Sequence, residues 1–280
     1  MHAVSVRAGI TIFAMFCALT GGTFQQAHGG LFTLTDGNSS ATVNTGSQAG
    51  MSSWLVSGED QMYQQWFWYR IGNTAESSLD TLKIVTEGTS DLNFNGDADA
   101  LFVRYQGAGF YLDLRYSLHG GTAASRTSDM AEQISITNES NGPLDFHFFQ
   151  YSDFDLGPGP GGETAVFTNL NAVRQQEGGS ILTETVITPV ASHREIDFYN
   201  NTLTALNDGV ATTLSDTPIG LVVGPGDMTW AYQWDVLIPR GGTFQISKDK
   251  NLYVIPEPST LALASLAALG LLVVRRRKQH

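Results

Sequence analysis

The sequence predicts an all-β protein, built as a single large antiparallel β-sandwich or jelly roll with an apolar segment at each end. Short runs rich in aromatic and β-branched residues recur between clusters of Gly, Asn, Asp and Pro across residues 30–250. Several of these runs alternate apolar and polar residues, as half-buried strands do. Tight-turn dipeptides separate neighbouring runs, which favours antiparallel hairpins over a parallel sheet.

The turn dipeptides are of the Asn-Gly and Asp-Gly type, which favours two-residue hairpin turns. Helical periodicity is weak, and residues 76–83 are the best helical candidate. The predicted hairpins join residues 31–35 to 40–44 through Asp36-Gly37, residues 133–138 to 144–151 through Asn141-Gly142, and residues 196–206 to 210–214 through Asp208-Gly209.

Aromatic residues are concentrated in three of the predicted strands. In residues 110–116, Phe110, Leu112, Leu114 and Tyr116 share one face. Residues 66–69 are aromatic on both faces, which is typical of a central strand covered on both sides. The alternative is an exposed platform on which sugar rings stack. Its candidate residues are Trp66, Trp68, Trp230 and Trp234.

The first 29 residues have the pattern of a secretory signal peptide. Arg7 gives a positive start, residues 8–19 are apolar, and Ala27 and Gly29 are small residues at the −3 and −1 positions of a cleavage site. The only cysteine, Cys17, lies within this segment. The exported chain is therefore expected to have no thiol, disulfide or thiolate metal site.

Residues 30–250 are expected to form one domain, with residues 248–252 as a loose connector to the tail, residues 251–280. Without Arg7 and the four cations near the C-terminus, ten Lys and Arg remain against 27 Asp and Glu, a formal charge of −17. Such a surface repels nucleic acid, so nucleic-acid binding is not expected.

The tail consists of a proline-rich start, an apolar run and a basic end. Prolines at its start prevent a helix of the preceding domain from continuing into the tail. Residues 261–274 carry no charge and would span roughly 21 Å as a helix, which predicts a short membrane-spanning segment. A buried helix of the domain is the alternative, but this run has no polar face. The flanking residues are Pro256, Glu257, Pro258, Ser259 and Thr260 before the run, and Arg275, Arg276, Arg277 and Lys278 after it.

This arrangement resembles the PEP-CTERM sorting signal of Gram-negative bacteria, over residues 254–280 alone. The resemblance implies recognition by a membrane-embedded exosortase and removal of the tail near Pro256-Glu257-Pro258. It also implies export to the envelope or to an exopolysaccharide-rich exterior, after transient anchoring in the inner membrane. The expected partners are the exosortase, the general secretion machinery and exopolysaccharide. The resemblance implies no fold or activity for the domain.

One acidic loop has the spacing of a calcium site. Oxygen-bearing side chains occupy the first, third, fifth, seventh and ninth places, and Gly96 occupies the sixth. The twelfth place is Phe102 instead of the Glu that closes an EF-hand, so a simple hairpin at Asn95-Gly96 is the alternative. A looser segment, Asp153-Phe154-Asp155, is a second candidate cation loop. The calcium candidates of the first loop are Asp91, Asn93, Asn95, Asp97 and Asp99.

Catalytic motifs are absent from the sequence, which contains no nucleophile elbow, zinc-binding helix or phosphate loop. His147 lies in a predicted strand, and alternation places His193 on one face with Glu195 and Asp197. A row of polar residues is usually a solvated face, so no enzymatic activity is expected. The predicted function is an exported structural or adhesive protein of the cell exterior. The alternatives are a carbohydrate-binding module, assisted by calcium, and an enzyme acting on polysaccharide.

Overall fold

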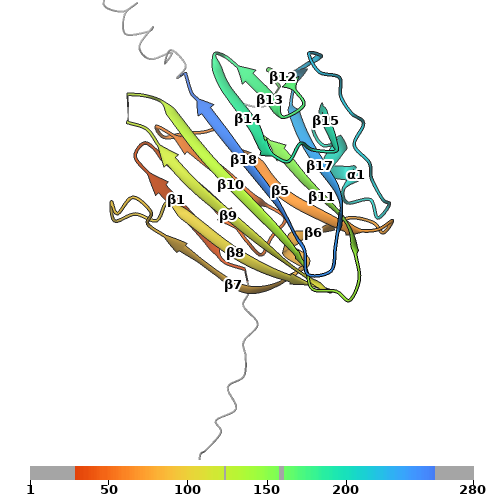
Figure 1. Cartoon of the computed structure of the whole chain (residues 1–280). Helices are drawn as coiled ribbons and strands as arrows, with labels where there is room; N and C mark the ends of the chain where they lie inside the picture. The colour runs from red at the N-terminus through yellow and green to blue at the C-terminus, as the bar shows by residue number, and fades with distance from the viewer. Residues whose placement is uncertain (1–28, 123, 158–160, 256–280) are drawn as a thin grey trace, which may run out of the picture.

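The computed structural model describes residues 29–122, 124–157 and 161–255. Two large sheets, almost entirely antiparallel, lie face to face in this part of the chain (Figure 1). The prediction of an all-β sandwich is therefore confirmed. The helices are short: the 3-10 turn η1 (Leu79–Thr81) and α1 (Asn201–Ala205).

The first sheet, called sheet A here, has nine strands with β18 near its middle. In spatial order they are β16 (Val222–Gly226), β12 (Glu163–Asn169), β13 (Ala172–Glu177), β14 (Ser180–Thr188), β18 (Thr243–Tyr253), β10 (Thr127–Asn138), β9 (Phe110–Gly120), β8 (Ala100–Gly107) and β7 (Lys83–Ser90).

The opposite sheet, called sheet B, also has nine strands. In spatial order these are β1 (Leu31–Asp36), β2 (Ser39–Asn44), β3 (Gly50–Val56), β5 (Gln64–Ile71), β11 (Leu144–Asp153), β17 (Met228–Ile238) and β15 (His193–Phe198), with β4 (Glu59–Asp60) beside β3 and β6 (Ser77–Ser78) beside β5.

The turn predictions are only partly correct. Asp36-Gly37 does join the hairpin β1–β2, and Gly37 has a positive φ of 52° that favours glycine. Asn141-Gly142 instead carries the chain from β10 in sheet A to β11 in sheet B. Asp208-Gly209 follows α1, and no strand follows it directly. The predicted helix at residues 76–83 is a short strand and η1.

The predicted connector at residues 248–252 is wrong. These residues belong to β18, which pairs with β10 on one side and β14 on the other (Figure 1). Leu252 is fully buried, and so are Lys248 and Lys250. The fold places the side chains of Lys248 and Lys250 inside the sandwich. The sheet therefore continues three residues beyond the predicted domain boundary at residue 250.

Aromatic side chains fill the space between the sheets. The predicted inner face of β9 is confirmed, because Phe110, Leu112, Leu114 and Tyr116 are at most 1% exposed. The predicted sugar-stacking platform is wrong, because its four rings are also at most 1% exposed and form part of the core. Those rings belong to Trp66, Trp68, Trp230 and Trp234.

Four buried charges cross the middle of this core. Glu132 of β10, Glu184 of β14, and Lys248 and Lys250 of β18 are all completely buried. The Lys248 Nζ lies 2.5 Å from a Glu132 oxygen and 3.4 Å from Glu184 Oε1, and the Lys250 ammonium pairs with both glutamates. Two positive and two negative charges make this buried quartet neutral, as a buried charge cluster must be to tolerate desolvation.

Two side chains of sheet B form hydrogen bonds with the quartet. Gln150 of β11 donates to Glu184 at 2.7 Å and accepts from Lys248, and Trp230 of β17 donates its indole N–H to Glu184 at 3.0 Å. The quartet therefore ties both sheets together through directional bonds. Burial opposes the charge on Glu132, but Lys248 and Lys250 outweigh it and hold the pKa of Glu132 below its ordinary value. Burial lowers the pKa of Lys248, and repulsion from the neighbouring Lys250 lowers it further.

Within the described residues, no helix is long and apolar enough to cross a membrane. The predicted signal peptide (residues 1–29, except for Gly29) and the predicted membrane segment (residues 261–274) lie outside those residues.

We expect Glu132→Gln to destabilise the fold by about 3–5 kcal/mol, because it leaves two buried ammonium groups with one carboxylate. Urea unfolding measures this loss. The control is Glu139→Gln, the same chemical change at an exposed position just beyond β10; it should alter the free energy of unfolding by less than about 0.5 kcal/mol. Equal effects of the two substitutions would contradict a role of the quartet in stability.

Candidate functional site

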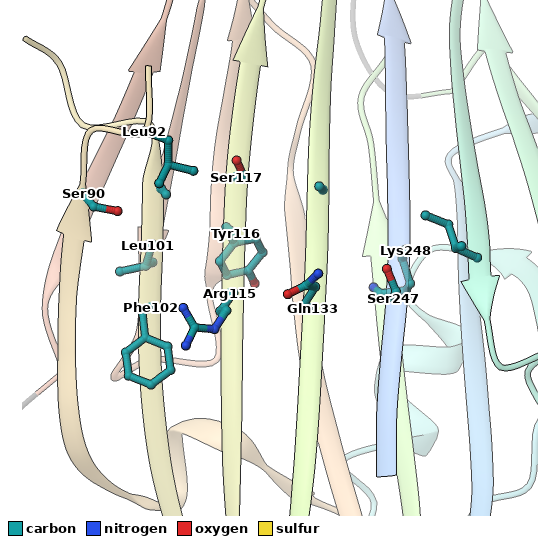
Figure 2. A pocket seen from close by; sticks show the side chains of 13 residues that line it. Ser90, Leu92, Leu101, Phe102, Arg115, Tyr116, Ser117, Gln133, Ser247 and Lys248 are labelled. Atoms are coloured by element: carbon teal, nitrogen blue, oxygen red, sulfur yellow. The ribbon is translucent and has the colours of Figure 1, made fainter. Parts of the chain in front are cut away.

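The outer face of sheet A carries a groove with a floor of small side chains. Strand alternation directs every second residue of β8, β9, β10 and β18 away from the core. Small residues at adjacent positions leave a cavity of about 250 Å³ (Figure 2). This volume is slightly below the roughly 300 Å³ at which small-molecule pockets begin, so it suits a single compact ligand. The floor is formed by Ala100, Ser117, Ala131 and Ser247.

The walls of this groove combine apolar surface with hydrogen-bond donors. Arg115 of β9 places its guanidinium carbon 4.4 Å from the centre of the Phe102 ring on β8, and Figure 2 shows the two side chains next to each other. Gln133 of β10 extends from the same face. Leu92 and Ile187 contribute apolar side chains. An aromatic ring beside amide and guanidinium donors is typical of sites that bind polyhydroxylated ligands.

Two carboxylates meet beside the floor of the groove. Asp249 of β18 lies directly across from Ala131 of β10, on the same outer face, and two residues further along β10 lies Asp129. Asp129 in turn faces His119 on β9 and accepts a hydrogen bond of 3.4 Å from the Asn251 amide. Partial burial and the neighbouring Asp129 raise the pKa of Asp249 to about 6.

This Asp129–Asp249 pair can hold and release a proton near neutral pH. Two neighbouring carboxylates repel each other when both are ionised, so one of them keeps its proton to a higher pH. The pair therefore suits proton transfer to and from a hydroxyl.

A second polar cluster lies on the outer face of sheet B. His147 Nδ1 is 2.5 Å from Asp235 Oδ1, and His193 Nε2 is 3.3 Å from the other oxygen of Asp235. His193 Nδ1 also contacts Asp216 at 2.7 Å. Asp235 thus bridges the two histidines that the sequence singled out. Burial favours a higher pKa of Asp235, but the hydrogen bonds with Gln233 and His147 and the proximity of both histidines outweigh it and lower that pKa.

The sequence predicted Glu195 and Asp197 as partners of His193, but the structure pairs it with Asp216 and Asp235. Glu195 accepts hydrogen bonds from the Thr202 hydroxyl at 2.7 Å and from the Ser215 amide at 2.8 Å. Asp197 accepts from the amides of Phe198 and Asn201. Both carboxylates thus hold the chain around α1. Among the described residues that line the groove of sheet A, none belongs to this histidine–aspartate cluster.

The predicted calcium loop connects β7 to β8 and is longer than the alternative two-residue hairpin turn. Asp91 and Asn93 accept hydrogen bonds from backbone amides of the same loop, at 2.8–3.2 Å. Asp99 is fully buried and accepts from the Leu92 amide at 2.8 Å, which places Leu92 beside the groove. Asn95 Nδ2 donates to Asp36. Calcium binding by Asp91, Asn93, Asn95, Asp97 and Asp99 stays a prediction.

Sequence comparison identifies the tail. Residues 254–278 match the family model of the PEP-CTERM protein-sorting motif. The chain carries a PEP-CTERM sorting motif. This motif includes the predicted processing residues from Pro256 to Thr260 and the basic residues from Arg275 to Lys278, which lie outside the described residues. It marks the protein as exported and sorted by an exosortase, as the resemblance implied.

The described part of the chain is similar in fold to several solved structures. A bacterial glucoamylase complexed with acarbose aligns with a TM-score of 0.55 and 10% identity, over 86% of this chain and 34% of the glucoamylase. A galactose mutarotase related enzyme from Lactobacillus acidophilus aligns with a TM-score of 0.51 and 8% identity, over 80% and 97% of the two chains.

A GalM/aldose epimerase homologue from C. elegans aligns with a TM-score of 0.50 and 8% identity, over 80% of this chain and 98% of the homologue. The chain thus spans about a third of the glucoamylase and nearly the whole of the two smaller proteins. No curated protein matches the sequence. At such low identities, these likenesses show the fold alone.

The expectation that the protein is not an enzyme is nevertheless corrected, because its fold is similar to those of a glucoamylase and a galactose mutarotase related enzyme. That expectation depended on the absence of catalytic sequence motifs. The glucoamylase and the mutarotase related enzyme have the same fold at 8–10% identity, so sequence motifs do not carry over between such chains. The predicted structural or adhesive role stays a prediction.

We expect the carboxyl group of Asp249 to titrate near pH 6, in a carbon-13 NMR titration of the side-chain carboxylates. Its pKa is raised in the folded protein, so Asp249 contributes stability below the ordinary Asp pKa that is lost as the pH rises toward 6. Asp129→Asn should lower the midpoint toward the ordinary value near 3.9, because it removes the neighbouring negative charge. An unchanged midpoint in that variant would contradict the paired arrangement.

Proposed function

We propose that this exported protein binds an aldose in the outer groove of sheet A and catalyses proton transfer on it through the Asp129–Asp249 pair. The observation that carries the proposal is a carboxylate pair beside a groove lined by Phe102, Arg115 and Gln133. The reaction that suits it is interconversion of the two anomers of the sugar.

The groove offers complementary groups for a sugar ring. The Phe102 ring and the side chains of Leu92 and Ile187 provide apolar surface for the C–H face of the ring. The guanidinium of Arg115 and the amide of Gln133 provide donors for its hydroxyls. A pocket of this size holds one sugar residue and leaves any attached chain outside, which favours recognition of a free or terminal aldose.

The chemistry needs one group that accepts a proton and one that donates a proton. A carboxylate of the pair removes the proton from the anomeric hydroxyl while the bond between the anomeric carbon and the ring oxygen breaks. The ring oxygen receives a proton from the protonated carboxyl, and the product is the open-chain aldehyde. Rotation about the bond to the carbonyl carbon and reversal of both transfers then give the other anomer. The pair ends in its starting protonation state, so no cofactor is required.

The comparisons and the destination of the protein support this proposal. The fold is shared with a galactose mutarotase related enzyme and with a glucoamylase. The sorting motif directs the chain to a cell exterior expected to be rich in exopolysaccharide. Such an exterior supplies reducing sugars whenever polysaccharide is degraded.

We expect Asp249→Asn to slow anomer interconversion by about 10²-fold or more, because general acid–base catalysis contributes roughly 10²–10⁴-fold. The rate is measured by polarimetry on freshly dissolved α-glucose and α-galactose, at pH 7. Phe102→Ala should raise KM with little change in kcat, since the ring binds the sugar without reacting.

Glu59→Gln is the control for Asp249→Asn, because Glu59 is an exposed carboxylate on β4 in the opposite sheet. It should leave the rate unchanged. Sugar binding without any turnover by the unmodified protein would support the alternative of a carbohydrate-binding module. Neither binding nor turnover with any aldose would contradict the proposal.

We also infer that the tail is removed near Pro256-Glu257-Pro258 after transient anchoring in the inner membrane, so that the domain reaches the envelope or the exterior. Mass spectrometry of the exported protein should then give a C-terminus close to residue 256. Recovery of peptides containing Arg275 and Lys278 from the exported form would contradict this processing.

A further inference from the structure

Three aspartates from two segments of the chain converge at one end of sheet B. Asp153 ends β11, Asp155 follows two residues later, and Asp227 lies between β16 and β17. One carboxylate oxygen from each residue lies within 4.8 Å of the others. Ligands about 2.4 Å from one calcium ion lie at most about 4.8 Å apart, so this spacing suits a shared ion.

A cavity of about 200 Å³ opens onto these carboxylates. Tyr63 and Tyr199 complete its lining, and their rings meet edge to face with centroids 5.7 Å apart. The backbone fixes both tyrosines beside the acids, because the Tyr63 amide donates to the carbonyl of Asp153 and the Tyr199 amide to that of Asp227.

Two carboxylate oxygens of this cluster are buried with no hydrogen-bond partner among the described residues. Asp153 is only 1% exposed, and its Oδ1 accepts no hydrogen bond from the described residues, although Oδ2 accepts from the Tyr151 hydroxyl at 3.1 Å. Asp227 Oδ1 is also unpartnered. A buried carboxylate oxygen without a partner is costly, and a bound cation would satisfy it.

The described part of the chain supplies no cation that pairs with the cluster. Among the described residues, no Lys, Arg or His forms an ion pair with any of the three aspartates. Burial, followed by repulsion from Asp227, raises the pKa of Asp153 to about 8. The pKa values of Asp155 and Asp227 are raised as well, chiefly by burial.

Glu163 holds the segments that carry Asp155 and Asp227 together. It is completely buried, and its two oxygens accept from the Leu156 amide at 3.0 Å and from the Met228 amide at 3.2 Å. These amides directly follow Asp155 and Asp227 in the chain. One carboxylate thus fixes the spacing of two others, which is the arrangement of a preorganised site.

We propose that Asp153, Asp155 and Asp227 bind a divalent cation. Calcium suits the site best, because hard carboxylate oxygens are its preferred ligands and water can complete its coordination through the open cavity. The ion would link the end of β11 to the start of β17 and stabilise this end of sheet B. This site is separate from the groove of sheet A and does not depend on the proposed reaction.

The test compares thermal unfolding of the purified protein in 10 mM calcium chloride and in chelator. Calcium should raise Tm by a few degrees, as expected for an extracellular site with a Kd of about 1 mM. Asp227→Asn should remove most of this shift, and Asp155→Asn serves as a second variant if that protein does not fold. Terbium luminescence, sensitised by Tyr63 and Tyr199, should appear with the unmodified protein and be lost with the same substitution.

Asp97→Asn is the matched control, because Asp97 belongs to the other acidic loop of the chain, between β7 and β8. It should keep the full calcium shift. A shift that is lost in Asp97→Asn and kept in Asp227→Asn would place the ion in that loop and overturn the proposal. The absence of any shift and of terbium luminescence in the unmodified protein would also overturn it.

Discussion

The buried quartet of Glu132, Glu184, Lys248 and Lys250 is the constraint on which the rest of the sandwich depends. Each charge is paired only when β10, β14 and β18 lie in their observed register. A slip of β18 by one residue would turn Lys248 and Lys250 to solvent and leave two buried glutamates without cations. The same alternation that buries these lysines directs Asp249 to the outer face, so the quartet also positions the carboxylate pair.

Much of the fold could be predicted from the sequence because strand alternation and turn chemistry are local. The inner face of β9 and the hairpin at Asp36-Gly37 follow from neighbouring residues alone. Local signals do not say which sheet the next strand joins, and the turn at Asn141-Gly142 therefore changes sheets instead of closing a hairpin. The burial of Lys248 and Lys250 could not be predicted locally, because their partners Glu132 and Glu184 lie more than 60 residues away in the chain.

The candidate sites were harder to predict, because they too join residues that lie far apart in the chain. Asp129 and Asp249 become neighbours only through strand pairing, and Asp227 joins Asp153 and Asp155 only once β17 lies beside β11. The sequence did point to the Asp153–Asp155 segment and to both histidines. It left the tryptophans open between a core and a sugar-stacking platform, because an aromatic side chain suits a core as well as a sugar, and burial depends on the whole fold.

The sorting motif describes an exported protein, and we propose that its ligand-binding surface is the outer face of sheet A. A crystal structure with a bound aldose is the most direct test of this account. The expected result is a sugar in the groove, with its ring on Phe102 and its anomeric hydroxyl on Asp249. A sugar bound elsewhere on the molecule, with the groove unoccupied, would contradict it.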